Sequence, residues 1–236
     1  MSTLIFDIET VGVNFDTLDE KTKENLTAWI KRESEDEADY EKSLEVLKAG
    51  LGFSPLTGEI VAIGVLDADK EKGVVYFQSP EKDIEDFEEG GIKYKAMGED
   101  EMLAAFWEGA KSYQEFVTFN GRAFDAPFLN IRSAIHQIRP SVDLMSNRYL
   151  SSQKFGPRHV DLADQFTYYG AMRKHPSLHL LCRAFGIASP KEGEVTGDQV
   201  GQLFFNKEYE KIARYNAGDL FATKTLFEYW NTYLKF

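Results

Sequence analysis

The segment TLIFDIET, residues 3–10, is a short apolar run interrupted by two acidic residues. Successive side chains of a β-strand point to opposite faces, so Asp7 and Glu9 are expected to share the face of Ile5, while residues 4, 6 and 8 face the other way. Two carboxylates beside a hydrophobic core are unfavourable unless positive charge compensates them, and no Lys or Arg occurs among the first 20 residues. A divalent cation, which takes oxygen ligands, would compensate this charge. The alternative is that the strand ends here and both acids are solvated at its tip.

The composition predicts a soluble globular protein. Of the 236 residues, 43% are apolar and 14% are aromatic, which is sufficient for a packed core in one large domain or two small ones. The apolar runs are shorter than the roughly 18 residues of a membrane span, and the N-terminus lacks the features of a signal peptide, so no membrane association is expected. A single cysteine, Cys182, excludes an intramolecular disulfide and favours a cytoplasmic location.

The formal net charge of −12 argues at first against nucleic acid as a partner, because nucleic-acid binding normally depends on Lys and Arg. The charge is, however, unevenly distributed. Residues 1–101 carry 26 acidic and 11 basic side chains, whereas residues 102–236 carry 13 acidic and 16 basic ones. The second half is therefore the better candidate to face a polyanion. The acidic first half is either a solvated surface or the binding site of a protein partner.

Residues 11–58, which follow the first strand, are expected to form a helical insertion. Their apolar spacing predicts two helices. The second helix is expected to begin at a capping box formed by Ser34 and Glu37 and to end at Gly50.

After the insertion, two strands at 60–66 and 74–77 are expected to form an antiparallel meander with the first strand. From residue 101 onward helical and strand patterns alternate, which predicts an α/β second half. No internal repeat or low-complexity tract occurs, which favours a single domain over residues 1–236. Helices are expected at 102–113, 126–137, 178–185, 199–204 and 208–234, the last with an apolar stripe at Leu220, Phe227 and Leu234, and short strands at 116–119 and 159–162.

Two later segments carry acidic residues at positions suited to a site. Asp125, in TFNGRAFDAPFL, follows a predicted strand and precedes Pro127, so it lies where a helix begins, near the carboxyl end of the strand. An Asp in this position is often only a helix cap, which is the alternative explanation. Tyr215 and Asp219, in YNAGD, are four residues apart and share one face of a helix, although such a pair is often incidental.

Together, FDIET, NGRAFDAPFL and YNAGD resemble, in order and separation, the three motifs of the tyrosine-containing branch of the DEDD superfamily of 3′–5′ exonucleases. The second motif is most similar to that of the proofreading domain of family-B DNA polymerases and of stand-alone predicted exonucleases related to it. The resemblance implies an RNase H-like α/β fold, with a mixed central sheet flanked by helices. One departure is Ala123, where polymerase proofreading domains commonly have a second Asn, so contacts with the substrate strand are expected to differ there.

The resemblance also implies a role for each residue of the motifs. Asp7 would bridge two metal ions, Glu9 and Asp219 would complete the first site, and Asp125 would hold the second. The Tyr215 hydroxyl would orient the attacking water. In such hydrolysis two divalent ions generate the nucleophilic hydroxide and stabilise the leaving oxygen. Because all these ligands are oxygens, two Mg²⁺ or Mn²⁺ ions are the expected cofactors.

Substrate contacts are expected in two parts of the chain. Between residues 139 and 174, basic residues are interleaved with aromatic ones, which suits a nucleic-acid groove, although the aromatic residues there are as easily explained as core. Near the motifs, Thr10 and Val11 are expected to meet the terminal nucleotide, and Asn120 resembles the leading Asn of the second motif. The candidates for substrate binding are Thr10, Val11, Asn120, Arg122, Arg148, Lys154 and Arg158.

The sequence therefore predicts a metal-dependent 3′–5′ exonuclease that acts on single-stranded DNA ends. An exoribonuclease is the alternative among enzymes, because the same carboxylates serve both sugars and no residue that reads the 2′-hydroxyl is identified. A non-catalytic domain that binds nucleic acid or protein is the alternative of another class, and the complete set of acids with the tyrosine argues against it.

Overall fold

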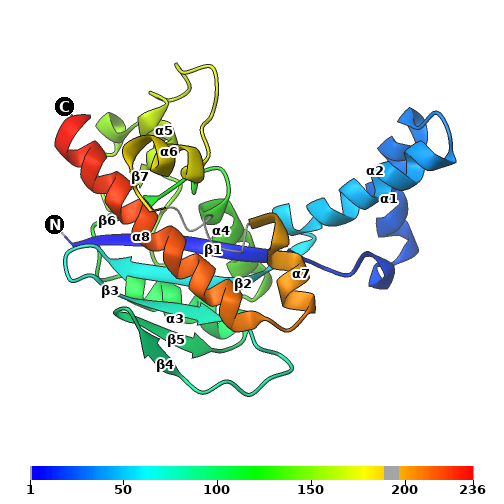
Figure 1. The fold of residues 1–236 in the computed structure, drawn as a ribbon, viewed down its shortest axis with the longest axis horizontal. Coiled ribbons are helices and arrows are strands. Elements are labelled where there is room, and N and C mark those ends of the chain that lie inside the picture. The colour runs from blue at the N-terminus through cyan, green and yellow to red at the C-terminus, as the bar shows by residue number, and fades with distance from the viewer. Residues whose placement is uncertain (1, 189–196, 236) are drawn as a thin grey trace.

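The protein is built on a mixed β-sheet of seven strands (Figure 1). The computed structural model describes residues 2–188 and 197–235. The strands are β1 (Thr3–Gly12), β2 (Gly58–Asp67), β3 (Lys72–Phe77), β4 (Phe87–Glu89), β5 (Ile92–Ala96), β6 (Glu115–Thr118) and β7 (Arg158–Asp161). Their order is β4-β5-β3-β2-β1-β6-β7, which places β1 in the interior of the sheet, between β2 and β6. β1, β2 and β3 form the expected antiparallel meander, while β1, β6 and β7 run parallel.

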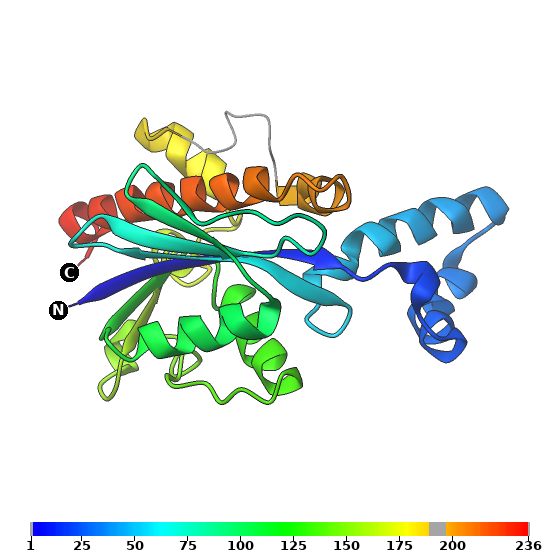
Figure 2. The same ribbon diagram turned by 90° about the horizontal axis from the view of Figure 1, so that it is seen from below.

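Helices cover both faces of the sheet (Figure 2). One face is crossed by α8 (Tyr209–Tyr233), and α6 (Leu178–Phe185) lies on the same side. The other face is covered by α3 (Glu99–Ala110) and α4 (Asp125–Ile135). The predicted α/β architecture, a mixed sheet with flanking helices, is therefore confirmed. No helix in the described part of the chain is long and apolar enough to cross a membrane.

Two apolar cores fill the spaces between the sheet and the helices. The core on the α8 side contains Ile5 and Val11 of β1, and the core on the side of α3 and α4 contains Leu4, Phe6 and Ile8. The predicted alternation of β1 is confirmed. It directs the side chains of residues 7 and 9 toward α8.

A β-bulge interrupts the pairing of β1 with β2 beside the two acidic residues. Glu9 is paired with Ala62, whereas the next residue, Thr10, is paired with Ile60, which leaves Val61 as an extra residue in β2. Bulges increase the local twist of a strand and are common next to active sites. The sheet therefore bends immediately after the second carboxylate of β1.

Residues 13–57 project from the sheet as a helical arm (Figures 1 and 2). The arm contains α1 (Glu20–Glu33), α2 (Glu37–Gly50) and a short 3₁₀ turn, η2 (Leu51–Phe53), so the two helices expected between the first strands are present. The two ends of the arm are joined where they leave the sheet, because Val13 N donates a hydrogen bond to Thr57 O at 2.9 Å.

The second arm helix begins later than predicted, but it ends at Gly50 as expected. α2 is capped by Asp36, whose side chain accepts a hydrogen bond from Asp39 N, and Ser34 instead ends α1. Asp is as good an N-cap as Ser, and here it directly precedes the first helical residue. Gly50 is the last residue of α2 and has φ −82° rather than the left-handed conformation of a glycine cap, because η2 follows it directly.

Two short strands were not predicted. β4 and β5 form a hairpin in the acidic segment around Gly90 and Gly91, whose φ angles of 59° and 82° suit a tight turn. Strands of three and five residues are too short for their alternation to be recognised. The strand predicted at 159–162 ends at Asp161, because the next residue begins α5 (Leu162–Phe166).

Candidate active site

The carboxylates of Asp7, Glu9 and Asp219 lie together beside the second half of β1. One oxygen of each lies within 4.8 Å of the others. β1 supplies two of these residues through its alternation, and α8, which crosses the sheet over β1, supplies the third (Figure 1). The fold therefore joins the first and third motifs, which lie near opposite ends of the sequence.

Asp125 lies beside this group at the first residue of α4. Its Oδ1 accepts a hydrogen bond from Ile8 N at 3.0 Å, so its carboxylate touches β1 between the two acidic residues of that strand. It is not one of the three residues whose oxygens lie within 4.8 Å, but its charge contributes to the electrostatics of Asp7. The structure thus places all four predicted carboxylates around residues 7–9 of β1.

The loop that leads to Asp125 is held by Asp161 at the end of β7. Asp161 accepts hydrogen bonds from Asn120 N at 2.8 Å and from Arg122 N at 2.9 Å. Asn120 has φ 63°, a left-handed conformation that needs such support in a residue other than glycine. Asp161 therefore fixes the path of the second motif.

Asn216 of α8 holds the Asp7 carboxylate. Its Nδ2 donates a hydrogen bond to Asp7 Oδ2 at 2.8 Å, and the residue is fully buried. The contact depends on Gly64, the partner of Asp7 in β2, because a Cβ at position 64 would lie 2.0 Å from Asn216 Oδ1. Sequence reasoning missed Asn216. The available signal was its place four residues before Leu220, on the predicted apolar stripe, where an Asn is unusual.

Tyr215 lies one helical turn before Asp219 and forms a hydrogen bond with it. Gly197 lies next to its hydroxyl, since a Cβ there would be 3.7 Å from Tyr215 Oη. Burial raises the pKa of Tyr215, and the carboxylates of Asp219, Glu9 and Asp7 raise it further. The hydroxyl therefore stays protonated at neutral pH and can donate a hydrogen bond.

The same crowding acts on the acids themselves. Burial raises the pKa of Asp7 well above its ordinary value, and the carboxylates of Asp125, Glu9 and Asp219 add to the rise, against the hydrogen bond from Asn216. Burial likewise raises the pKa of Asp125. These residues fit a divalent metal centre, because the donors are all carboxylate oxygens and a bound cation would offset their mutual repulsion.

A model of the family "Predicted 3′-5′ exonuclease related to the exonuclease domain of PolB" matches residues 56–234. The chain belongs to this family of 3′–5′ exonucleases. The matched segment includes the second and third motifs, whereas Asp7, Glu9 and nearly all of the arm precede it. Among curated proteins no match is found.

Among solved structures, the exonuclease is similar to the family B DNA polymerase of the hyperthermophilic archaeon Pyrobaculum calidifontis, with 18% sequence identity and a TM-score of 0.59. The similarity covers 98% of the exonuclease and 24% of the polymerase, so the chain spans about a quarter of the polymerase's length. At this identity the likeness shows the fold alone, and it confirms the expected RNase H-like α/β fold.

Of the substrate-binding candidates, Thr10 and Val11 lie directly beyond the carboxylates of β1. The Thr10 hydroxyl donates to Gly52 O at 2.7 Å, and Val11 is buried in the core on the α8 side. Both also line a cavity between β1 and the arm. Their placement is consistent with contact to a nucleotide bound at the carboxylates.

Asn120 and Arg122 lie in the loop before Asp125. The Asn120 residue is exposed, whereas the Arg122 guanidinium donates to the carbonyl oxygens of Leu144, at 3.3 Å, and Ser146, at 2.9 Å. Arg122 therefore holds the segment around residue 145 against the second motif. A substrate phosphate would have to share the Arg122 guanidinium with these two carbonyl oxygens.

In the basic segment 139–174, two of the three candidate residues already lie beside an acidic partner. Arg148 forms a bidentate ion pair with Asp164, and Lys154 is exposed. Arg158 lies 3.7 Å from Glu115, at the start of β7. Arg158 is in register with Glu115 of β6, and Glu115 is in register with Thr3 of β1. Thr3 precedes Asp7 by four residues, so Arg158 is displaced from Asp7 by roughly 13 Å along the strands, toward the N-terminal end of β1. We therefore leave Arg158 out of the proposed site.

Without metal, the exonuclease is expected to lose thermal stability as the pH rises from about 5 to about 8. The raised pKa values of Asp7 and Asp125 mean that the folded state binds these protons more tightly than the unfolded state, so stability is greatest below the ordinary Asp pKa and falls as both groups ionise. Thermal unfolding in EDTA should show this fall, and Mn²⁺ should raise the melting temperature more at pH 8 than at pH 5. Asp7→Asn should show a smaller fall. A melting temperature with the same pH dependence in both proteins would contradict the expectation.

Proposed function

We propose that this exonuclease removes nucleotides from the 3′ end of single-stranded DNA, using two divalent ions, Mg²⁺ or Mn²⁺, held by Asp7, Glu9, Asp125 and Asp219. The observation that supports the proposal most directly is the group of three carboxylates within 4.8 Å, with Asp125 bonded to the strand between them. The buried Asn216 holds the Asp7 carboxylate in place, and Gly64 leaves the space for Asn216. A cluster of surface acids without a function would not need this support.

The residues of the chain have separate tasks in this mechanism. When bound, a pair of divalent ions lowers the pKa of a water and stabilises charge on the leaving oxygen. Asn216 keeps the Asp7 carboxylate in one orientation through its 2.8 Å hydrogen bond. The Tyr215 hydroxyl, held by its hydrogen bond to Asp219, accepts a hydrogen bond from the attacking water and fixes its direction. Burial of the acids limits competing contact with bulk water.

The preference for DNA rests on the structural relative, which is a family B DNA polymerase. RNA is the second candidate, because the same carboxylates would serve either sugar. A protein partner for the acidic first half also stays a prediction. Many of its acids lie in the arm, in the helices α1 and α2 and the turn that joins them.

The test uses the full chain with single-stranded DNA and RNA of one sequence, labelled at the 5′ end, in Mg²⁺, Mn²⁺ or EDTA. We expect a ladder of products shortened from the 3′ end, faster on DNA and absent in EDTA. A circular single-stranded DNA, which has no end, should remain intact. Cleavage of the circle or full activity in EDTA would contradict the proposal, and a faster ladder on RNA would assign the alternative substrate.

A further inference from the structure

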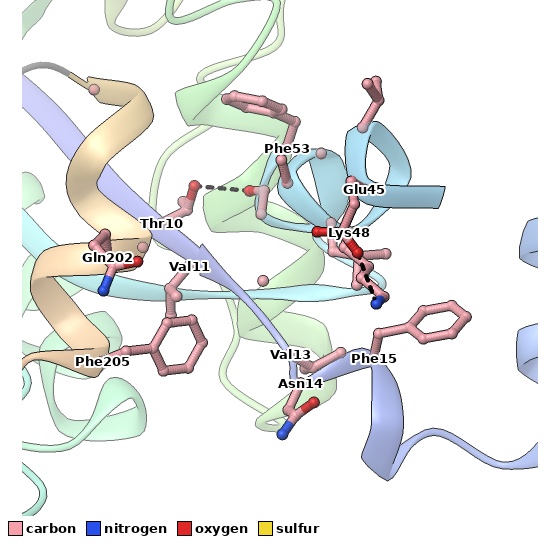
Figure 3. Close-up of a pocket in the computed structure, with 18 of the residues that line it drawn as sticks. Thr10, Val11, Val13, Asn14, Phe15, Glu45, Lys48, Phe53, Gln202 and Phe205 are labelled. Carbon is pink, nitrogen blue, oxygen red and sulfur yellow. Dashed lines mark hydrogen bonds and ion pairs between the residues drawn. The ribbon is translucent and has the colours of Figure 1, made fainter. Parts of the chain in front are cut away.

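A large cavity lies between the end of β1, the arm and α7 (Val200–Phe205), with a volume of about 1090 Å³. Glu9 and Thr10 are among its lining residues, so it opens directly onto the carboxylate group. Figure 3 shows Gln202 and Phe205 of α7 on one side of β1, and Phe53, Glu45 and Lys48 of the arm on the other. The volume reaches the upper end of the roughly 300–1,000 Å³ usual for small-molecule sites.

The arm side of the cavity is firmly attached to the active-site strand. Thr10 Oγ1 donates to Gly52 O at 2.7 Å (Figure 3). Gly12 and Gly52 touch backbone to backbone, because a Cβ at Gly52 would lie 3.0 Å from Gly12 N. Phe53 also meets Phe124, the residue before Asp125, with ring centroids 6.4 Å apart in an edge-to-face arrangement. The position of Phe53 is therefore set by two of the segments that carry the acids.

The lining of the cavity favours a flat apolar group over a charged one. Phe53 is 67% exposed and Phe205 is 61% exposed, although both are large aromatic residues. Among the lining residues that the structure describes, Lys48 is the one basic side chain, and it is already paired with Glu45 at 3.0 Å. The lining acids outnumber it, so phosphate would be repelled from this wall, whereas a nucleobase would be accepted.

We propose that the arm forms the outer wall of the binding site for the terminal nucleotide, the one to be released, and that its base stacks on Phe53. The inference rests on the proposed function, because it needs the scissile phosphate at the carboxylates. It assigns to the arm a role in holding the unpaired end of the substrate. Stacking on an aromatic side chain is tolerant of base identity, so the site should accept purines and pyrimidines alike.

The test compares two single-stranded DNA oligonucleotides that differ in the last residue, one ending in thymidine and the other in an abasic tetrahydrofuran residue. Affinity is measured with Ca²⁺ and the kinetic constants with Mn²⁺, for the parent, Phe53→Ala and Phe53→Tyr. The parent should prefer the thymidine end by about 5- to 150-fold, as stacking energies imply. Phe53→Ala should lose most of this preference through KM with a smaller change in kcat, and Phe53→Tyr should keep it.

Phe155→Ala is the matched control, because Phe155 is a phenylalanine that is 92% exposed and does not line the cavity. It should discriminate between the two ends as the parent does. The inference is overturned if Phe53→Ala keeps the parental preference, or if Phe155→Ala loses as much of it. A parent that does not degrade either oligonucleotide in Mn²⁺ would instead overturn the proposed function, so the two failures are distinguishable.

Discussion

Replacing Asp7 by Asn is expected to abolish nuclease activity while the protein remains folded. Asp7 stands at the centre of the site, since its carboxylate interacts with those of Asp125, Glu9 and Asp219. Mutating a group that only supports a metal ligand typically costs 10- to 100-fold, so loss of a proposed direct metal ligand should lower the rate by more than about 10³-fold. Rates on labelled single-stranded DNA in Mn²⁺ measure this loss.

The fold should tolerate Asp7→Asn, because the amide oxygen can still accept the hydrogen bond from Asn216 and one repelling charge is removed. The melting temperature in EDTA at pH 8 should be equal to that of the parent or higher. Asp69→Asn, at an exposed position in the turn after β2, is the matched control and should keep parental activity. An active Asp7→Asn protein would remove Asp7 from the mechanism, and an unfolded one would make its role structural.

Tyr215→Phe should lower the single-turnover rate by about 10²- to 10⁴-fold, the usual contribution of one side chain that assists proton transfer or orientation. The ring stays in place in this variant, and only the hydroxyl beside Asp219 is lost. Affinity for single-stranded DNA in Ca²⁺ should therefore change little. The effect should appear in the rate of the chemical step rather than in binding.

Tyr229→Phe is the control for Tyr215→Phe, because Tyr229 is partly buried on the same helix but packs against Phe185 and Tyr233. It should retain the parental rate. If both variants cleave at the parental rate under single-turnover conditions, the hydroxyl of Tyr215 has no part in the reaction.

Local patterns in the sequence were sufficient for the parts of the site that depend on one element. Alternation along β1 placed Asp7 and Glu9 on one face, and the four-residue spacing in α8 placed Tyr215 beside Asp219. Contacts between elements were not accessible in this way. The hydrogen bond from Asn216 to Asp7 depends on how closely α8 approaches β2, which is set by a glycine with no signal of its own.

The number of basic residues in a segment also could not locate a substrate groove, because it does not reveal which Lys and Arg side chains already form ion pairs with Asp or Glu. Arg148 and Arg158 have acidic partners in Asp164 and Glu115, and Arg158 lies at the start of β7, in register with Glu115. The cavity was missed for a related reason. Phe53 and Phe205 are separated by about 150 residues in the sequence, and their common lining appears only when the arm and α7 are both placed.

The interior position of β1 in the sheet has a consequence for the order in which the protein is made. β1 is synthesised early, but its neighbours in the sheet are β2 and β6, and its parallel partner β6 begins more than 100 residues after it. Such long-range pairing is slow, since the chain between the strands must first be closed into a loop. Tyr215 and Asp219 emerge from the ribosome later still, with α8. A chain that ends before α8 carries at most three of the four proposed metal ligands, so the proposed metal site is complete only once α8 has been made.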